Sequence, residues 1–169
     1  VKDKKRQFFN FLAPTITAEN NRLLKLRGQM LTLLEKISLE QPLSSAEQLQ
    51  IKELAKSYRI TGSASQLQLV HELTKRIDIV PSQLILVQAA NESAWGTSRF
   101  ARIGLNFFGI WCYKKGCGMV PSARNAGAKH EVAAFKSVSA AVRHYLHNIN
   151  TNHAYQVLRN IRLHLREQN

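Results

Sequence analysis

The feature that most constrains the fold is an apolar segment near the middle of the chain. Pro81 stands where the first residue of a helix is expected, and it opens the sequence P-S-Q-L-I-L-V-Q-A-A-N-E. Apolar side chains occupy nearly every side of this predicted helix, so we expect it at the centre of the fold rather than at its edge. The helix nevertheless ends in Asn91 and Glu92. A carboxylate at the end of a buried helix is costly unless it is satisfied or used.

Helical patterns also cover most of the remaining chain. Apolar residues at three- and four-residue spacings predict a helix over residues 19–38. Ser44 and Glu47 form a capping-box pattern that predicts a second helix, and a third is expected from about residue 65. Two amphipathic helices are expected to close the chain. Their predicted buried faces consist of Val138, Ala141, Val142, Tyr145, Leu146 and Ile149, and of Ala154, Val157, Leu158, Ile161 and Leu165.

Residues 104–135 differ in character from the helical segments. Glycine and proline interrupt short aromatic and β-branched pieces, which predicts loops with a small β-hairpin. The chain's two cysteines, Cys112 and Cys117, lie here in the sequence C-Y-K-K-G-C. Two thiols cannot complete a four-ligand zinc site, and no suitable histidine pair is nearby, so no metal is expected. The cysteines either form a local disulfide in an oxidising compartment or remain reduced at a turn.

The charge of the chain narrows the candidates for chemistry. The 24 lysines and arginines against 11 acidic residues give a net charge of +13, which attracts polyanions such as nucleic acid, acidic lipid headgroups or an anionic cell wall. The basic residues are scattered and match no familiar recognition motif, so no nucleic-acid partner is expected. After residue 78 the only acidic residues are Glu92, Glu131 and Glu167. Carboxylate chemistry in this half therefore has few candidates.

Glu92 is the only acidic residue between residues 79 and 130. It ends an apolar helix and precedes S-A-W-G and an aromatic, glycine-rich stretch, a setting that suits a general acid acting on a sugar. Burial among apolar groups raises the pKa of a carboxyl group, which then holds a proton near neutral pH. This interpretation requires apolar groups such as Trp95 to shield Glu92. The alternative is an ordinary helix-end glutamate paired with Arg99 or Arg102.

Two motifs resemble those of a known family. N-E-S-A-W-G-T-S-R-F-A at residues 91–101, followed by L-N-F-F-G-I-W at 105–111, resembles the E-S-x-W-G and N-L-F-G-I pair of the family 73 glycoside hydrolases. These are peptidoglycan β-N-acetylglucosaminidases with a lysozyme-like fold. The cysteine-containing loop and the basic amino-terminal helices look most like the bacterial Bax-type proteins of that group. The resemblance covers roughly residues 65–165.

The resemblance implies a fold and a domain organisation. We expect a mainly α, lysozyme-like glucosaminidase domain with a small β-hairpin lobe over residues 61–169. Residues 1–60 lie outside the shared core and are expected to form an amino-terminal helical extension packed on it. This extension could brace the core, cover the cleft or bind a partner.

The resemblance also implies catalytic residues. Glu92 matches the family's catalytic acid, and N-H-A-Y resembles N-x-x-Y, so that Tyr155 matches a tyrosine proposed to act beside it. Scarcity leaves Glu131 as the candidate second carboxylate. Its carboxyl group would lie about 6.5–9.5 Å from that of Glu92 for inversion, or about 5–5.5 Å for direct attack. The alternative for Glu131 is a solvated strand residue beside Lys129, and the alternative for Tyr155 is a surface ring at a helix start. If Glu131 lies too far from Glu92, the substrate's 2-acetamido group or a water held by Tyr155 must supply the second function.

Further residues are expected to bind the substrate. Those of the second motif would line the floor of the cleft, and aromatic rings would stack on the apolar faces of sugars. Packing in the core is the alternative for several of them. The expected substrate-binding residues are Trp95, Asn106, Phe107, Phe108, Gly109, Trp111 and Tyr113.

The predicted function is hydrolysis of the GlcNAc-β-1,4-MurNAc bond of peptidoglycan, with Glu92 protonating the glycosidic oxygen. We expect a monomer that acts on glycan strands in the periplasm or outside the cell, without a metal or organic cofactor. No apolar run approaches the ~20 residues needed to cross a bilayer, and a signal segment is expected to be absent from this chain. The rival is a lytic transglycosylase on the same fold, in which one glutamate both donates and accepts the proton. A basic, non-catalytic wall-binding module is a further alternative.

Overall fold

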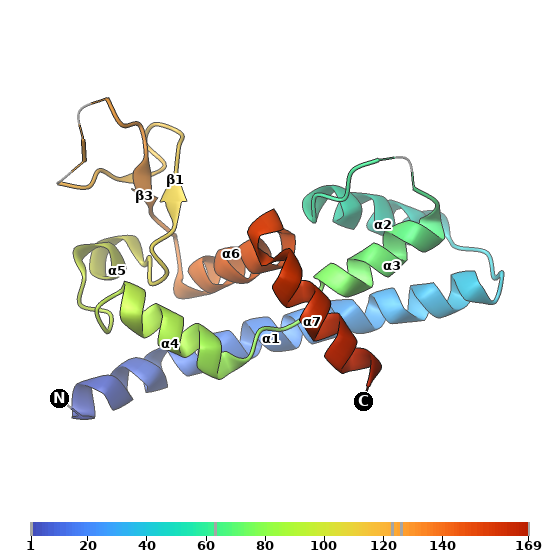
Figure 1. Ribbon diagram of the computed structural model, residues 1–169, viewed down its shortest axis with the longest axis horizontal. Coiled ribbons are helices and arrows are strands. Elements are labelled where there is room, and N and C mark those ends of the chain that lie inside the picture. Colours follow the sequence, from blue (N-terminus) through green and yellow to red (C-terminus); the bar gives the residue numbers. More distant parts are fainter. Residues whose placement is uncertain (1, 63, 123, 126, 169) are drawn as a thin grey trace. The chain divides into compact units, whose positions relative to one another are not determined.

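A computed structural model describes residues 2–62, 64–122, 124–125 and 127–168. The chain is mainly α-helical with one small antiparallel sheet (Figure 1), which confirms the predicted fold class. The helices are α1 (Lys2–Ser38), α2 (Ser45–Ser57), α3 (Gln66–Arg76), α4 (Ser82–Glu92), α5 (Arg99–Gly104), α6 (Val138–Thr151), the 3-10 helix η1 (His153–Tyr155) and α7 (Gln156–Glu167). The strands are β1 (Trp111–Cys112), β2 (Gly118–Met119) and β3 (Glu131–Ala133). In the described residues no helix is both long and apolar enough to cross a membrane.

The helix starts follow the local rules that the sequence indicated. The Oγ atom of Ser44 accepts a hydrogen bond from the Glu47 N–H, and the Glu47 carboxylate accepts one from the Ser44 N–H. Ser65 and Gln68 form the same reciprocal cap at the start of α3. Such a cap stabilises a helix by about 1 kcal/mol. The predicted capping box at residue 44 is therefore confirmed.

The first helix is longer than predicted. It begins at Lys2 instead of residue 19 and runs through Pro14. Phe8, Leu12 and Ile16, spaced four residues apart, are buried along one side of this early part. Burial of this stripe accounts for the additional helical turns, because an amphipathic face stabilises a helix mainly through its packing.

The chain divides into two compact units, which we describe separately. Unit 1 contains Val1–Glu19 and Val80–Tyr145, and unit 2 contains Asn20–Ile79 and Leu146–Asn169. Each unit includes residues from both sides of the boundary near residue 60 that the sequence suggested. Helices α1 and α6 each contribute to both units.

Unit 1 contains α4, α5 and the sheet. Strand β3 lies between β1 and β2 and is antiparallel to both, with Trp111 opposite Val132 and Gly118 opposite Ala133. The expected hairpin is thus a three-stranded sheet whose central strand comes last in the sequence. The β3 backbone is buried along its length, so the sheet is a compact lobe rather than an open loop.

Helix α4 departs from the expectation of burial on all sides, which is wrong. Ile85, Ala89 and Ala90 are buried, whereas Leu84 and Val87 are 47% and 53% exposed. Only one face of the helix packs within unit 1. The apolar composition of α4 therefore does not make it a central helix.

Unit 2 is organised around a buried carboxylate. Asp78 is 2% exposed, and its two oxygens accept hydrogen bonds from Arg166 at 2.8 and 3.1 Å. Arg27 and Arg162 each approach it at 3.7 Å. Burial alone would raise the pKa of Asp78, but the hydrogen bonds from Arg166 and the Ile79 N–H, with the neighbouring positive charges, lower it. Asp78 is therefore held as an anion inside the unit.

The same cluster reverses the expected orientation of α7. The prediction that Val157, Ile161 and Leu165 are buried is wrong, because all three are more than half exposed. The inner face of α7 carries arginines instead: Arg159 is buried, and Arg162 donates to the backbone carbonyl of Ile79 at 3.1 Å. Carbonyl groups and Asp78 satisfy these cations, which periodicity alone cannot anticipate. The predicted buried face of α6 is confirmed at Ala141, Val142, Leu146 and Ile149.

Candidate active site

Glu92 is the last residue of α4, and its side chain is exposed. Its Oε1 atom accepts a hydrogen bond from Nε2 of Gln88, one helical turn earlier, at 3.1 Å. Within the described parts of the chain Glu92 forms no ion pair, so the alternative of a pair with Arg99 or Arg102 is wrong. The expected apolar shield around the carboxyl group is also wrong, because the group faces solvent. Glu92 is an accessible carboxylate whose orientation Gln88 restrains.

The chain turns sharply after Glu92. Ala94, Trp95 and Gly96 all have positive φ angles, of 51°, 59° and 75°. Side chains disfavour this conformation, at a cost of about 1–2 kcal/mol for each of the two non-glycine residues. Ser93, fully buried, stabilises the turn: its Oγ donates to the Ala89 carbonyl at 2.6 Å and accepts from the Gly96 N–H at 2.8 Å. The E-S-x-W-G motif therefore describes a strained turn held by one serine.

Aromatic rings of α1 pack against this turn. The Trp95 ring lies 6.0 Å from that of Phe8 and 5.4 Å from that of Phe9, and the Lys5 ammonium group lies 4.5 Å from its centroid. Phe8 also contacts Phe107. A β-carbon at Gly96 would lie 3.0 Å from Phe8, and the φ of Gly96 is 75°, so both the packing and the backbone favour glycine here. The start of α1 thus braces the turn, and Trp95 packs among aromatic rings.

Asn106 fixes the second motif. It is 2% exposed, and its side-chain amide donates to the carbonyls of Ile110 and Ala133 at 2.8 and 2.9 Å. Its Oδ1 atom accepts from the N–H groups of Phe108 and Ile110 at 3.3 and 3.1 Å. All of its hydrogen-bonding capacity is used within the protein. Asn106 therefore ties the loop 106–110 to β3, which favours a scaffolding role over direct contact with a sugar.

This loop brings Gly109 to the carboxyl group of Glu92. Gly109 has a φ of 61°, and a β-carbon built on it would lie 3.0 Å from Oε2 of Glu92. The two motifs therefore meet at this point. Absence of a side chain at residue 109 leaves room beside the carboxylate.

The aromatic candidates divide into buried and exposed rings. Phe107 and Phe108 are buried, and Phe108 stacks on Tyr145 with centroids 4.2 Å apart. Trp111 and Tyr113 are 55% and 74% exposed. Trp111 stacks on His130 at 4.4 Å, which fixes its plane while leaving the ring accessible. The burial of Phe107 and Phe108 favours core packing, whereas Trp111 and Tyr113 are open to a ligand.

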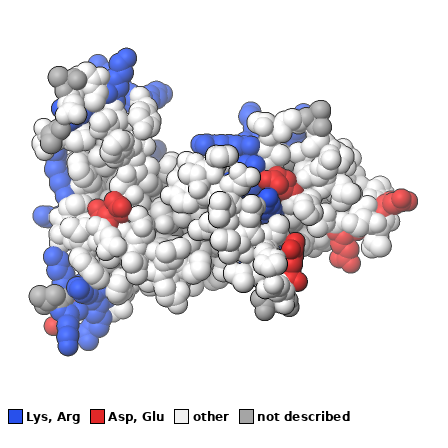
Figure 2. Space-filling view, in the orientation of Figure 1, with Lys and Arg blue, Asp and Glu red and all other residues white. Residues whose placement is uncertain are grey.

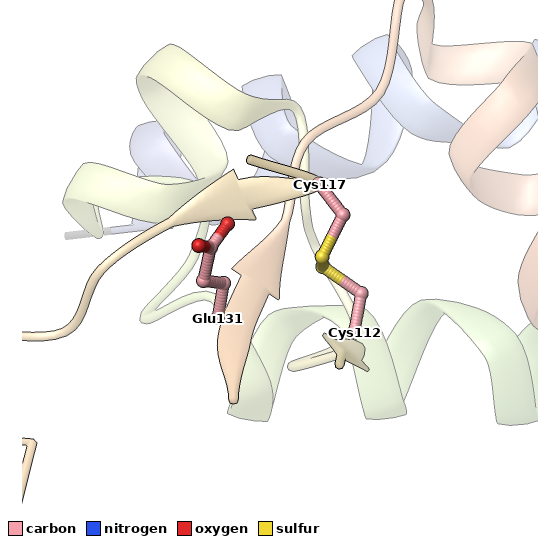
Figure 3. Close-up of side chains that lie close together, drawn as sticks. All are labelled: Cys112, Cys117 and Glu131. Carbon is pink, nitrogen blue, oxygen red and sulfur yellow. A yellow bond between two sulfur atoms is a disulfide. The ribbon is translucent and has the colours of Figure 1, made fainter. Parts of the chain in front are cut away.

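Glu131 lies at the start of β3 beside a disulfide between Cys112 and Cys117 (Figure 3). It is 6% exposed, and its two oxygens accept hydrogen bonds from the N–H groups of Gly116 and Gly118 at 3.0 and 2.9 Å. These bonds lower the pKa of Glu131. Glu131 is therefore an anion whose oxygens hold the loop on both sides of Cys117. The disulfide alternative is confirmed.

No metal site follows from this cluster. Among the described residues, Cys112, Cys117 and Glu131 form the one group with suitably close potential ligand atoms. Both sulfur atoms are in the disulfide and are not available as thiolates.

Tyr155 belongs to unit 2, whereas Glu92 and Glu131 belong to unit 1. It ends η1 and is half-buried. The Asn152 side chain caps η1 by accepting from the Ala154 N–H at 3.0 Å. The capped start thus forms as one alternative expected, and the catalytic role of Tyr155 stays a prediction.

Positive charge surrounds parts of unit 1. On the face shown in Figure 2, lysine and arginine side chains gather over the N-terminal end of α1 and over the loops of the small sheet. The exposed cations of these segments are Lys2, Lys4, Lys5, Arg6, Lys114, Lys115 and Lys129. Such a field attracts polyanionic substrates.

Comparison with known proteins agrees with this arrangement. Residues 67–168 match the family described as mannosyl-glycoprotein endo-beta-N-acetylglucosaminidase. The chain belongs to this glucosaminidase family. The family match begins near the predicted domain start, and the resemblance drawn from the two motifs is confirmed.

A curated relative of the glucosaminidase chain extends the comparison. The chain is 32% identical over 165 residues to protein Bax of Escherichia coli strain K12. The match covers 97% of this chain and 57% of that protein, so the chain spans less than two thirds of its relative. No solved structure gives a significant match.

Sequence reasoning missed several residues around the glucosaminidase motifs. Gln88 restrains Glu92, and its signal was the four-residue spacing on one helix. Phe8 and Phe9 brace Trp95, but nothing in the sequence pairs residues so far apart. The buried cluster at Asp78 had a signal in the spacing of Arg159, Arg162 and Arg166 along α7.

Proposed function

We propose that this chain cleaves the GlcNAc-β-1,4-MurNAc bond of peptidoglycan with Glu92 as the general acid. The observation that carries the proposal is the geometry at Glu92. Its carboxyl group is exposed, forms no ion pair with any described residue, is restrained by Gln88 and has no side chain beside it at Gly109. A general acid needs this accessibility, since it must come within hydrogen-bond reach of the leaving oxygen.

Glu92 would act as the acid in the complex with substrate. In the free protein the carboxyl group faces water. A glycan strand lying over α4 would exclude this water, and removal of water favours the neutral form of a carboxyl group. The acid would then donate its proton to the glycosidic oxygen as the bond to the anomeric carbon breaks.

The geometry at Glu131 restricts which group can supply the second catalytic function, the activation of water. Both oxygens of Glu131 already hold the backbone at Gly116 and Gly118. We therefore propose that Glu131 mainly shapes the lobe. Water activation would then come from the substrate's 2-acetamido group or from a water held by Tyr155. The role of Glu131 as a base stays a prediction that Glu131→Gln tests.

The accessible carboxylate of Glu92 also supports a second function. A lytic transglycosylase needs only one free carboxylate, because the residue that donates the proton also removes one from the 6-hydroxyl of MurNAc. Glu92 alone meets this requirement. The products distinguish the two reactions, since hydrolysis gives reducing GlcNAc ends and the rival gives anhydro ends.

The expected location and substrate contacts follow from the lobe. A disulfide between Cys112 and Cys117 is typical of an oxidising compartment, which supports action in the periplasm or outside the cell. Trp111 and Tyr113 offer exposed rings for sugar stacking. The positive charge supports attraction to the carboxylates of the cell wall.

The test is mass analysis of purified sacculi digested with this chain. We expect soluble fragments with reducing GlcNAc ends, and loss of all products with Glu92→Gln. Glu53→Gln removes the same charge from an exposed position on α2 and should digest like the native chain. Full activity of Glu92→Gln would overturn the proposal, and inactivity of the native chain on sacculi would favour a wall-binding module.

A further inference from the structure

A pocket lies in unit 2, away from the residues of the site at Glu92. Its volume is about 300 Å³, and it is formed by Arg59, two residues beyond the end of α2, by α3, by the last residue of α6, and by η1 with the first half of α7. Four cations line it: Arg59, Lys75, Arg76 and Arg159. Glu72 is the one carboxylate among its lining residues.

The charges in this pocket do not balance. Glu72 accepts a hydrogen bond from Nε of Arg76 at 2.9 Å, and these two residues form an ion pair. Within the described residues, Arg59 and Lys75 have no carboxylate partner. In the described part of the chain, one cation that forms an ion pair and three that form none therefore line the same pocket.

Arg159, one of the three cations of the pocket without a carboxylate ion pair, is buried. Its side chain is 4% exposed, and Nη1 donates to the carbonyls of Ile149 and Asn152 at 2.8 and 2.7 Å. The carboxylate of Asp78 is taken by other arginines of unit 2. Burial lowers the pKa of Arg159 and the positive charge of Arg76 lowers it further, while the charge of Glu72 offsets only part of this. A buried cation is costly unless an anion accompanies it, and the nearby carboxylate of Glu72 is already paired with Arg76.

Arg59 occupies a position where glycine is preferred. The Arg59 N–H donates to the Lys56 carbonyl and the Ile60 N–H donates to the Ala55 carbonyl, which is the Schellman arrangement at the end of α2. Arg59 takes the left-handed position of this motif, with a φ of 56°. A side chain there is unfavourable for folding. Its presence is explained if the guanidinium group serves the pocket.

We propose that this pocket binds an oxyanion group, a carboxylate or a phosphate, carried by a small ligand. The fork of Arg159 and the groups of Arg59 and Lys75 supply donors of the kind that recognise carboxylate and phosphate oxygens. The proposal does not depend on the role of Glu92. It assigns unit 2 a ligand site of its own.

The test is a titration of the whole chain with inorganic phosphate and, separately, with succinate, at constant ionic strength. Arginine side-chain Nε–Hε and backbone signals are followed by NMR. We expect saturable shifts at Arg159 and at the amides of residues 153–156 with at least one probe. Binding of phosphate alone assigns a phosphate ligand, and binding of succinate alone assigns a carboxylate. Absence of saturable shifts with both probes would overturn the proposal.

Three variants that each remove one positive charge separate a site from general attraction. Lys75→Gln should weaken the binding about tenfold, as expected for loss of one charged contact. Arg59→Gly should weaken it similarly while raising the thermal midpoint, because glycine suits the left-handed position. Lys52→Gln changes an exposed lysine of α2 outside the pocket and should leave affinity unchanged. Equal weakening in all three would show that only net charge matters and would refute the site.

Discussion

Replacement of Asn106 by alanine tests whether one buried amide holds the second motif. The substitution removes four hydrogen bonds, two donated to the carbonyls of Ile110 and Ala133 and two accepted from the loop. Each is worth about 0.5–1.5 kcal/mol net, so the free energy of unfolding should fall by about 2–6 kcal/mol. This is a large part of the ~5–15 kcal/mol that stabilises a typical domain. We expect a loss near the middle of this range, because the backbone carbonyl and N–H groups that lose the Asn106 side chain as a partner stay buried.

Urea denaturation followed by tryptophan fluorescence measures this loss where it occurs. The chain's two tryptophans, Trp95 and Trp111, both lie in unit 1, as does Asn106. The matched control is Asn125→Ala, at an exposed position in the loop before β3, which should change stability by less than about 0.5 kcal/mol. A loss below about 1 kcal/mol for Asn106→Ala, or an equal loss in the control, would refute the assignment of Asn106 as the anchor of the loop.

A second variant of the same residue separates donors from acceptors. Asn106→Asp keeps the oxygen that accepts from Phe108 and Ile110 but places a carboxylate oxygen against two carbonyl groups. Burial and these carbonyls favour the protonated acid, which can donate one hydrogen bond. The deficit in stability relative to the native chain should therefore shrink as the pH falls, whereas that of Asn106→Ala should not. Parallel pH dependences would contradict this interpretation.

Three further predictions address other parts of the structure. Gly109→Ala places a methyl group 3.0 Å from Oε2 of Glu92, and digestion of sacculi should fall at least about tenfold. The control Gly127→Ala also changes a glycine with positive φ, but its methyl group would meet no other atom within 4 Å, and this variant should retain activity. Glu131→Gln removes a carboxylate whose pKa is lowered in the folded protein. The carboxylate therefore stabilises the fold at neutral pH, and this contribution is lost as the pH falls through its folded-state pKa. The urea midpoints of the native chain and the variant should converge in acid. Asp78→Asn leaves three arginines without their carboxylate and should reduce the free energy of unfolding by about 3–5 kcal/mol, measured by circular dichroism.

The sequence predicted local structure better than the orientation of helices. Capping at Ser44 depends on neighbours within a few residues, so the residue types themselves indicate it. The orientation of α7 depends instead on partners distant in sequence. Its apolar stripe predicted a buried face, but arginines that bind Asp78 and backbone carbonyls occupy the inside. Periodicity identifies two faces of a helix and cannot rank them when the polar face has buried partners.

The candidate site shows the same limit. The motifs located Glu92 and Gly109, and the structure brings them together. The expectation of a buried Glu92 failed because composition was taken for burial: α4 is apolar on most sides, yet Leu84 and Val87 remain exposed. The anchoring of Glu131 by Gly116 and Gly118 could not be predicted, because it depends on how the disulfide loop folds back on β3.

The residues that build a motif and the residues that select its substrate need not be the same. In this chain the hydrogen bonds of Ser93 hold the turn, whose backbone conformation Gly96 allows, and those of Asn106 hold the loop. The ring of Phe108 is buried against Tyr145. A side chain that is satisfied within the fold has little capacity left for a ligand. The motifs therefore describe how one carboxylate is presented beside a glycine. Under the proposed function, selection of a particular glycan therefore depends on exposed groups outside these anchors, and a chain could keep both motifs intact while its substrate preference changes.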